Sequence, residues 1–151
     1  MICFREGEVM AVPKGNLELV PPSIEATLAA YHAMRKRMLF DPIGRSYDEN
    51  HPDESRDVNH RRVLLLDGEI IGTVRIDLDV PEVTFRLVTI REDLQRRGYG
   101  RVLVALSESF ARSSGCRRVV VTAGDQSVGF WEKCSYSHFS DGQRIIMRKD
   151  L

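Results

Sequence analysis

The sequence predicts an α/β fold in which a mixed, predominantly antiparallel sheet is flanked by helices. Two observations predict this class. A meander of three strands can be followed from residue 63 to residue 90, and a helix and a further strand come after it as a crossover. The chain has 151 residues, a typical length for one domain that buries its own core. We therefore expect residues 1–151 to form a single domain.

Composition excludes several classes of protein. Basic and acidic residues are equal at 22 each, and the nucleic-acid and membrane-surface binders usually need a basic excess, so neither partner is expected. No apolar run approaches membrane-spanning length, and no secretory signal is predicted. Cys3, Cys116 and Cys134 form no C-x-x-C pair, which favours free thiols in a reducing cytoplasm over a disulfide framework or a zinc ribbon.

The elements before the meander are two short strands and one helix. Residues 3–6 and 17–20 are weak strand candidates, and Ser23 can cap the helix that follows. Asp41–Pro42 is expected to end this helix, and residues 41–62 read as a long polar surface loop. The apolar side chains at helical spacing are Ile24, Leu28, Tyr31, Met34 and Met38.

The meander begins with a hairpin. Residues 63–66 and 69–77 are predicted strands, and Asp67–Gly68 between them is a strong two-residue turn signal. Pro81 breaks the second strand, and residues 83–90 form the third. Antiparallel order places the start of the first strand, the end of the second and the start of the third at one edge. That edge lies opposite the loop after residue 90.

A crossover and a final hairpin complete the fold. The crossover helix is expected to end at residues 113–115. The apolar run at 119–123 suits a strand covered on both faces. The side chains expected to be buried on the helix are Val102, Leu103, Leu106 and Phe110, and those expected to face away are Arg101, Ser107, Glu108 and Arg112. The last elements are a helix at 126–133 and strands at 136–139 and 144–148.

The segment 90–101 carries the chemistry. A buried strand ends, a loop rich in arginine and glycine follows, and an amphipathic helix begins. The first N–H groups of a helix have no partner within it and carry partial positive charge. Gly98 and Gly100 permit close approach of a ligand, and Arg96, Arg97 and Arg101 add full charges. An anion such as a phosphate group is the expected ligand.

Three phosphate-binding patterns compete for this loop. A P-loop ends in Gly-Lys-Ser/Thr, which is missing. A dinucleotide fingerprint needs a third glycine where this chain has Leu103. The run Gln95-Arg96-Arg97-Gly98-Tyr99-Gly100 fits the Q/R-x-x-G-x-G/A loop of the GCN5-related N-acetyltransferases, the GNAT superfamily. A glycine-rich turn that merely starts a helix is the competing structural interpretation.

The resemblance to this superfamily is specific over residues 85–139 and weak before residue 63. Members often read close to R-x-x-V-x-P-x-x-R-G-x-G-x-G in the strand and loop, and F-Y-E-K-L-G-F in the later helix. The corresponding runs here are RLVTIREDLQRRGYG at 86–100 and FWEKCSY at 130–136. The resemblance implies the GNAT acyl-CoA N-acyltransferase fold, with one N-acetyltransferase domain over residues 1–151.

The implied activity is transfer of an acyl group from acetyl-CoA, or a related small acyl-CoA, to a primary amine of a small molecule, peptide or protein. The backbone near Val88 would pair with the pantetheine arm, the helix start would hold the pyrophosphate, and the later helix would flank the other side. The implied cofactor site comprises Val88, Thr89, Ile90, Gln95, Arg96, Arg97, Gly98, Tyr99, Gly100, Arg101, Phe130, Trp131 and Lys133.

Two positions depart from the family pattern. The tyrosine that often protonates the leaving thiolate is Trp131 here, and an indole N–H is too weak an acid for this task. A glutamate that serves as base in some members corresponds to Thr84. His60, Glu82 and Tyr136 are the candidates for the missing catalytic groups. For His60 an exposed loop position, and for Tyr136 a core position, are the competing structural interpretations.

Several alternatives stay open at this point. The polar residues His51, Asp53, Glu54, Asp57 and His60 match no strong metal-site spacing, so no metal is expected. Their segment reads either as an acceptor-recognition loop or as a plain solvated loop. The rival functions are an acyl-homoserine lactone synthase, which shares the general architecture, and a non-catalytic acyl-CoA sensor. The oligomeric state is open, with a homodimer as one option.

Overall fold

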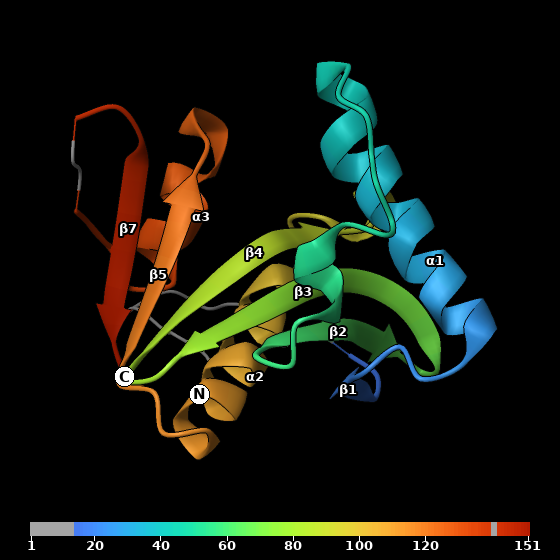
Figure 1. The fold of residues 1–151 in the computed structure, drawn as a ribbon, viewed down its shortest axis with the longest axis horizontal. Coiled ribbons are helices and arrows are strands. Elements are labelled where there is room, and N and C mark those ends of the chain that lie inside the picture. The colour runs from blue at the N-terminus through green and yellow to red at the C-terminus, as the bar shows by residue number, and fades with distance from the viewer. Residues whose placement is uncertain (1–13, 140–141) are drawn as a thin grey trace.

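The structure is a computed structural model that describes residues 14–139 and 142–151 (Figure 1). The predicted strand at 3–6, and Cys3, lie outside these residues. The elements in chain order are β1 (Leu17–Val20), α1 (Glu25–Arg35), the π-helical turn η1 (Lys36–Phe40), the 3-10 turns η2 (Asp41–Ile43) and η3 (Pro52–Ser55), β2 (Asn59–Leu66), β3 (Glu69–Asp79), β4 (Glu82–Ile90), η4 (Glu92–Leu94), α2 (Tyr99–Ser113), β5 (Arg118–Ala123), η5 (Asp125–Ser127), α3 (Val128–Lys133), β6 (Ser137–His138) and β7 (Ile145–Asp150).

The strands form a seven-stranded sheet in the order β1-β2-β3-β4-β5-β7-β6. Only the β4–β5 pair is parallel, and the other five pairs are antiparallel. The predicted meander, crossover and final hairpin are all present, and the mixed α/β class is confirmed. No helix in the described ranges carries an apolar stretch long enough to cross a bilayer.

The first helix begins and ends later than expected. It starts at Glu25 without a side-chain cap, so Ser23 does not cap it, and Ile24 is 63% exposed rather than part of the buried face. At the other end the helical path continues through η1 and η2 to Gly44, whose φ is 65°. Proline is tolerated in the first turn of a helical segment, and therefore Asp41–Pro42 starts η2 instead of ending the path.

A β-bulge interrupts the third strand of the meander. Thr73 of β3 lies opposite Thr89 of β4, whereas Arg75 lies opposite Arg86. Two residues of β4, Leu87 and Val88, therefore face a single residue of β3. Leu87 has a φ of 55°, a value that residues other than glycine seldom adopt, and the Thr73 hydroxyl donates to its carbonyl oxygen at 3.2 Å. The bulge bends β4 at its middle.

Helix α2 is rotated relative to the sequence prediction. Leu103 is buried as expected, but Ser107 and Glu108 are buried as well, which contradicts their predicted position on the solvent side. The Glu108 carboxylate accepts hydrogen bonds from the Tyr136 hydroxyl at 3.0 Å and from Lys149 Nζ at 3.1 Å. These partners satisfy the charge, and burial of a paired carboxylate is tolerated where an isolated one is not. Glu108 thus ties α2 to Lys149 of β7.

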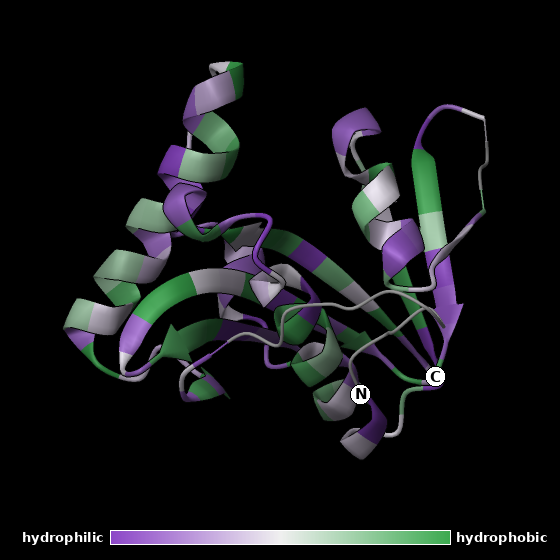
Figure 2. Cartoon of the chain, turned by 180° about the vertical axis from the view of Figure 1, so that it is seen from behind, coloured by the Kyte–Doolittle hydropathy of each residue, from purple (hydrophilic) through white to green (hydrophobic). Residues whose placement is uncertain are grey.

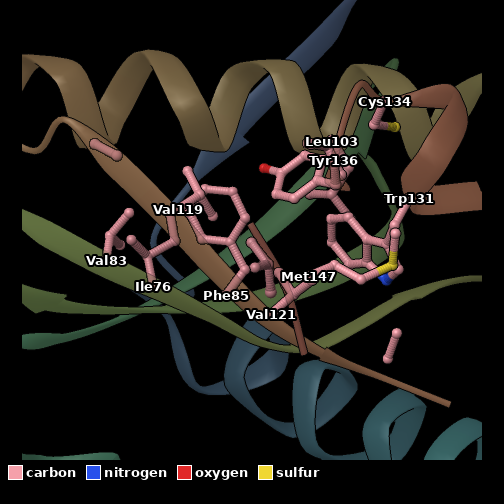
Figure 3. Close-up of a cluster of buried hydrophobic side chains, with 14 of the residues drawn as sticks. Ile76, Val83, Phe85, Leu103, Val119, Val121, Trp131, Cys134, Tyr136 and Met147 are labelled. Carbon is pink, nitrogen blue, oxygen red and sulfur yellow. The ribbon is translucent and has the colours of Figure 1, made fainter. Parts of the chain in front are cut away.

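The apolar core fills the space between the sheet and the helices α2 and α3 (Figure 3). Figure 2 shows hydrophobic and hydrophilic residues alternating around the helices, as expected for amphipathic elements. In β5 only Val119, Val121 and Ala123 are buried, while Thr122 is exposed. The prediction that both faces of this strand are covered is therefore wrong. Its second face opens beside β4.

Gly72 is expected to tolerate no larger side chain. A Cβ built there would lie 2.7 Å from Ile90 Cδ1 and 2.9 Å from the Thr89 carbonyl oxygen, and the backbone atom cannot move aside freely. We predict that Gly72→Ala lowers the free energy of unfolding by about 1–3 kcal/mol, measured by urea denaturation. Gly129→Ala is the matched control, because nothing lies within 4 Å of a Cβ built there and alanine has a higher helix propensity than glycine in α3. Equal stability of Gly72→Ala and the wild type would contradict this packing.

Candidate functional site

The strands β4 and β5 run together for only three residues. Residues 82–84 pair with residues 118–120, and no pairing between the two strands continues beyond them in the described chain. Figure 1 shows the two strands adjacent near the C terminus and well apart at their other ends. The β5-facing edge of β4 is therefore open from the bulge to Ile90. This parting also leaves Thr122 of β5 exposed.

A cleft of about 900 Å³ occupies this opening on the α1 side of the sheet. Its floor is the bent part of β4, from Phe85 to Val88, and one wall comes from the chain between residues 39 and 54. The opposite wall is formed by β5 and α3, and it includes Thr122, Phe130 and Trp131. The cleft thus lies between two segments that are far apart in the sequence.

The glycine-rich loop connects the open strand to α2. The Gln95 side-chain amide donates to the Ile90 carbonyl oxygen at 2.8 Å, which closes the turn. Arg96 has a φ of 61° and Gly98 a φ of 90°. These two residues with left-handed backbone conformation turn the chain into the helix that begins at Tyr99. The first N–H groups of α2 are thereby left without helical partners at the loop. Together with exposed Arg96 and Arg97, they create a positive local field.

The loop packs against α3. A Cβ at Gly100 would lie 3.0 Å from Phe130 Cε2 and 3.3 Å from Phe130 Cζ, so only a glycine fits without displacing the ring. Phe130 and Trp131 contact each other edge to face at 5.1 Å between ring centroids, and both line the cleft. Of the predicted cofactor residues, Val88, Phe130 and Trp131 line the cleft, while Thr89, Ile90 and the loop from Gln95 to Arg101 lie outside its lining. Lys133 is exposed and is not part of the cleft lining.

A buried carboxylate holds the residue 39–54 wall against the sheet. Glu54 Oε1 accepts a hydrogen bond from Arg35 Nη2 and another from Arg75 Nη1, both at 2.9 Å. The Tyr31 hydroxyl donates to its other oxygen at 3.2 Å. Arg35 is 1% exposed and Glu54 is 7% exposed. One carboxylate in η3 therefore connects α1 with β3.

The ion pairs continue along the sheet toward the cleft floor. Arg75 donates to Asp77 through Nε at 2.7 Å and through Nη2 at 2.9 Å. Arg86 Nε donates to the same Asp77 at 3.0 Å. The five groups Arg35, Glu54, Arg75, Asp77 and Arg86 thus alternate in charge, and we call them the charge chain. It begins in the protein interior and ends at Arg86, which lines the cleft and is 52% exposed.

The charge chain sets the ionisation of its members. Burial alone would raise the pKa of Glu54, but hydrogen bonds and charge from Arg35 and Arg75 outweigh burial and lower it. Burial also lowers the pKa of Arg75, while the bonds to Asp77 and Glu54 overcome this effect and raise it. Glu54 is consequently ionised at neutral pH and is a poor proton acceptor. The interpretation of residues 41–62 as a plain solvated loop is wrong for this residue.

None of the three catalytic candidates from the sequence lines the cleft. His60 lies on the α2 face of the sheet, where its ring contacts Phe110 at 5.1 Å between centroids. Glu82 is half exposed and lies 3.6 Å from Arg118. Tyr136 is buried, and its hydroxyl donates to Glu108. The acidic and histidine side chains that do line the cleft are Asp48, His51, Asp53 and Glu54.

The sequence analysis did not single out the arginines of the charge chain. One signal was available, because Arg75 and Asp77 bear opposite charges at alternating positions on the same face of one strand. Their connection to Arg35 and Glu54 spans tens of residues and could not be read from spacing. Within residues 14–139 and 142–151, no group of three or more potential ligands could hold a metal ion.

Comparisons with known proteins place this geometry in context. A model of the GNAT acetyltransferase family matches residues 28–136. A Lactobacillus plantarum protein assigned as an N-acetyltransferase is 25% identical, with a TM-score of 0.74 and coverage of 89% of this chain and 98% of that one. An acyl-CoA N-acyltransferase from Pseudomonas aeruginosa is 16% identical, with a TM-score of 0.73 and coverage of 89% and 98%.

A third solved structure is the ribosomal-protein-S18-alanine N-acetyltransferase from Escherichia coli. It is 15% identical, has a TM-score of 0.72, and the match covers 90% of this chain and 94% of that one. At such identities the second and third structures show a shared fold and nothing about the acceptor.

Removal of the Glu54 carboxylate is expected to destabilise the protein strongly. Glu54→Gln leaves two buried arginines without their shared anion, and we predict a loss of about 3–5 kcal/mol at pH 7 in urea unfolding. Because the folded pKa of Glu54 is lowered, its contribution is present above the unfolded value of 4.5 and is lost as pH falls through the folded value.

The difference in free energy of unfolding between the wild type and the variant should therefore shrink as the pH falls below about 4.5. Glu92→Gln is the matched control, since Glu92 is 60% exposed and pairs at 3.5 Å with an exposed arginine. A loss below about 1 kcal/mol is expected for it. If the two variants were equally stable, the buried pairing would be contradicted.

Proposed function

Because this chain belongs to the GNAT acetyltransferase family, we propose that it transfers an acetyl or similar small acyl group from acyl-CoA to a primary amine held in the cleft. The observation that carries the proposal is the open edge of β4, which leads from the bulge at Leu87–Val88 directly to the glycine-rich start of α2. A strand edge offers hydrogen bonds to an extended amide-containing chain, and a helix start offers them to phosphate.

The described residues fit an acyl-CoA donor. The N–H groups at Gly98 to Arg101, with Arg96 and Arg97, suit a pyrophosphate, and the backbone from Val88 to Ile90 suits the amides of a pantetheine arm. The ring of Phe130 closes the other side of the loop through its contact with Gly100. Binding here would place a thioester near the bulge, where backbone N–H groups of β4 can stabilise a developing oxyanion.

The proposed reaction forms one bond and breaks another. The acceptor nitrogen bonds to the thioester carbonyl carbon, the carbon–sulfur bond breaks, and the sulfur leaves as the CoA thiol after taking a proton. A lysine-like amine has a pKa near ~10.4, so the acceptor must first lose a proton. Asp48, His51 and Asp53 line the cleft and are the groups placed to receive it, directly or through water.

The absence of a tyrosine at position 131 supports a rival function, a non-catalytic acyl-CoA sensor. Trp131 is 5% exposed and packs edge to face on Tyr136 at 4.9 Å, so the indole serves as a wall of the cleft. If the protein is an enzyme, water protonates the leaving thiolate.

We also propose a reducing, cytoplasmic location for the protein, supported by the free buried thiols of Cys116 and Cys134.

Donor binding should be visible in the fluorescence of the protein's one tryptophan. Trp131 lines the cleft, so acetyl-CoA is expected to change its emission and to raise the melting temperature. We predict that Arg97→Ala weakens the affinity about threefold at low salt, and less at high salt, because one exposed charge is lost. Arg117→Ala, an exposed arginine away from the cleft, should leave the affinity unchanged. Absence of both signals in the wild type would overturn the donor assignment.

Turnover is expected to appear as release of free thiol from acetyl-CoA in the presence of amines. The rate should rise with pH while the acceptor amine loses its proton, which a thiol-reactive dye measures directly. Acetyl-CoA without amine is the background control. Tight donor binding without thiol release across a broad amine panel would refute the enzyme and leave the sensor as the better account.

A further inference from the structure

The charge chain carries an excess positive charge. It contains three arginines and two carboxylates, which gives a net charge of one positive unit. The position of the excess follows from how the carboxylates are shared. Glu54 is divided between Arg35 and Arg75, and both oxygens of Asp77 accept hydrogen bonds from Arg75.

Arg86 receives the smallest share of this neutralisation. Its only hydrogen bond to a described residue is the one from Nε to Asp77 Oδ2 at 3.0 Å, and that oxygen also accepts from Arg75 Nη2 at 2.9 Å. The two terminal nitrogens, Nη1 and Nη2, have no partner among residues 14–139 and 142–151. Because Asp77 fixes the guanidinium through Nε, the end of its planar fork is left for another group.

The position of Arg86 places its terminal nitrogens near the proposed site of reaction. Arg86 lines the cleft and directly precedes the bulge at Leu87–Val88, beside which the proposed thioester would lie. A second arginine, Arg45, lines the cleft from the wall formed by residues 39–54, and its side chain has no ion-pair partner in the described chain. Arginine presents two parallel N–H groups that match the two oxygens of a carboxylate.

We infer that the acceptor is an amine that also carries a carboxylate, and that Arg86 binds this carboxylate next to the reacting nitrogen. The inference rests on the proposed function. It makes Arg86 a determinant of acceptor specificity, held in place by Asp77 and, through it, by the rest of the charge chain. Amino acids and their relatives are the class of acceptor that meets this description.

The acidic side chains of the cleft are compatible with such an acceptor. An oxygen of the Asp53 carboxylate lies 3.9 Å from Arg75 Nη2 and 3.8 Å from His51 Nδ1, and the side chain is 44% exposed. This carboxylate pairs with Arg75, and no hydrogen bond or ion pair joins it to Arg86 among the described residues. Asp48 and Asp53 offer negative charge to an ammonium, while Arg86 and Arg45 offer positive charge to a carboxylate, and a zwitterion uses both.

The test compares acceptors that share one apolar body and differ at the carboxylate position, with rates expressed per unprotonated amine because this position also shifts the pKa of the amine. Phenylalanine, phenylalaninamide and phenethylamine, with aliphatic sets of the same design, are measured for thiol release and for binding to the donor-loaded protein by Trp131 fluorescence. The wild type should prefer the carboxylate-bearing member by about 10-fold or more in kcat/KM, since a hydrogen-bonded charge pair is worth about that factor. The preference should be the same in the aromatic and aliphatic sets, because it depends on the carboxylate and not on the apolar body.

Arg86→Gln should abolish this preference while leaving acetyl-CoA affinity unchanged. The matched control is Arg118→Gln, because Arg118 also lies on a strand and donates through Nε to an aspartate, Asp150, at 2.9 Å, but does not line the cleft. Its preference should equal that of the wild type. Loss of preference in the Arg86 variant alone, with intact donor binding, supports the inference.

Two outcomes would overturn it: equal use and equal binding of the three matched acceptors by the wild type, or a preference that survives in Arg86→Gln. The wild-type panel decides even if the variant does not fold. Acceptor binding is measured as well as turnover. If the protein binds carboxylated amines without releasing thiol, the proposed enzyme fails while this inference stands.

Discussion

The parting of β4 from β5 is the constraint on which the site depends. Two parallel strands that pair over three residues and then separate leave main-chain groups of β4 without sheet partners in the interior of the fold. The bulge at Leu87 and Val88 bends β4 at the point of separation, and the turn closed by Gln95 brings the start of α2 to the end of the same strand. A ligand that is extended at one end and anionic at the other satisfies both features at once.

The second wall of the cleft depends on electrostatics more than on apolar packing. The segment between residues 39 and 54 has few buried apolar side chains, and its attachment to the sheet runs through Glu54. A buried ion pair of this kind is costly to desolvate, so its presence is weak evidence for stability by itself. What it provides is position, because the arginines from α1 and β3 hold one carboxylate from two directions. The wall is thus placed independently of the opposite wall formed by β5 and α3.

Local patterns predicted much of this architecture, and non-local pairing accounts for what they missed. Asp67–Gly68 and the alternation around it located the hairpin, and the run from Gln95 to Gly100 located the loop that leads into α2. Helix periodicity failed at Glu108 because its partner, Lys149, is 41 residues away. The same limit applies to Glu54 and its two arginines. Titration near neutrality favours His60 as a base, but the strand face decides which side chains reach the cleft, and His60 lies on the other face.

The contact between Gly100 and Phe130 also bears on how such sequences diverge. The family loop allows alanine as well as glycine at its last position, yet here a methyl group would lie 3.0 Å from the Phe130 ring, which would have to shift to accept it. The two positions are therefore one steric unit, although 30 residues separate them. In homologous chains they should covary, with alanine at the loop accompanied by a smaller or displaced side chain on α3. A change at either position alone would move the contact between the start of α2 and α3, so the pair would evolve together or remain fixed.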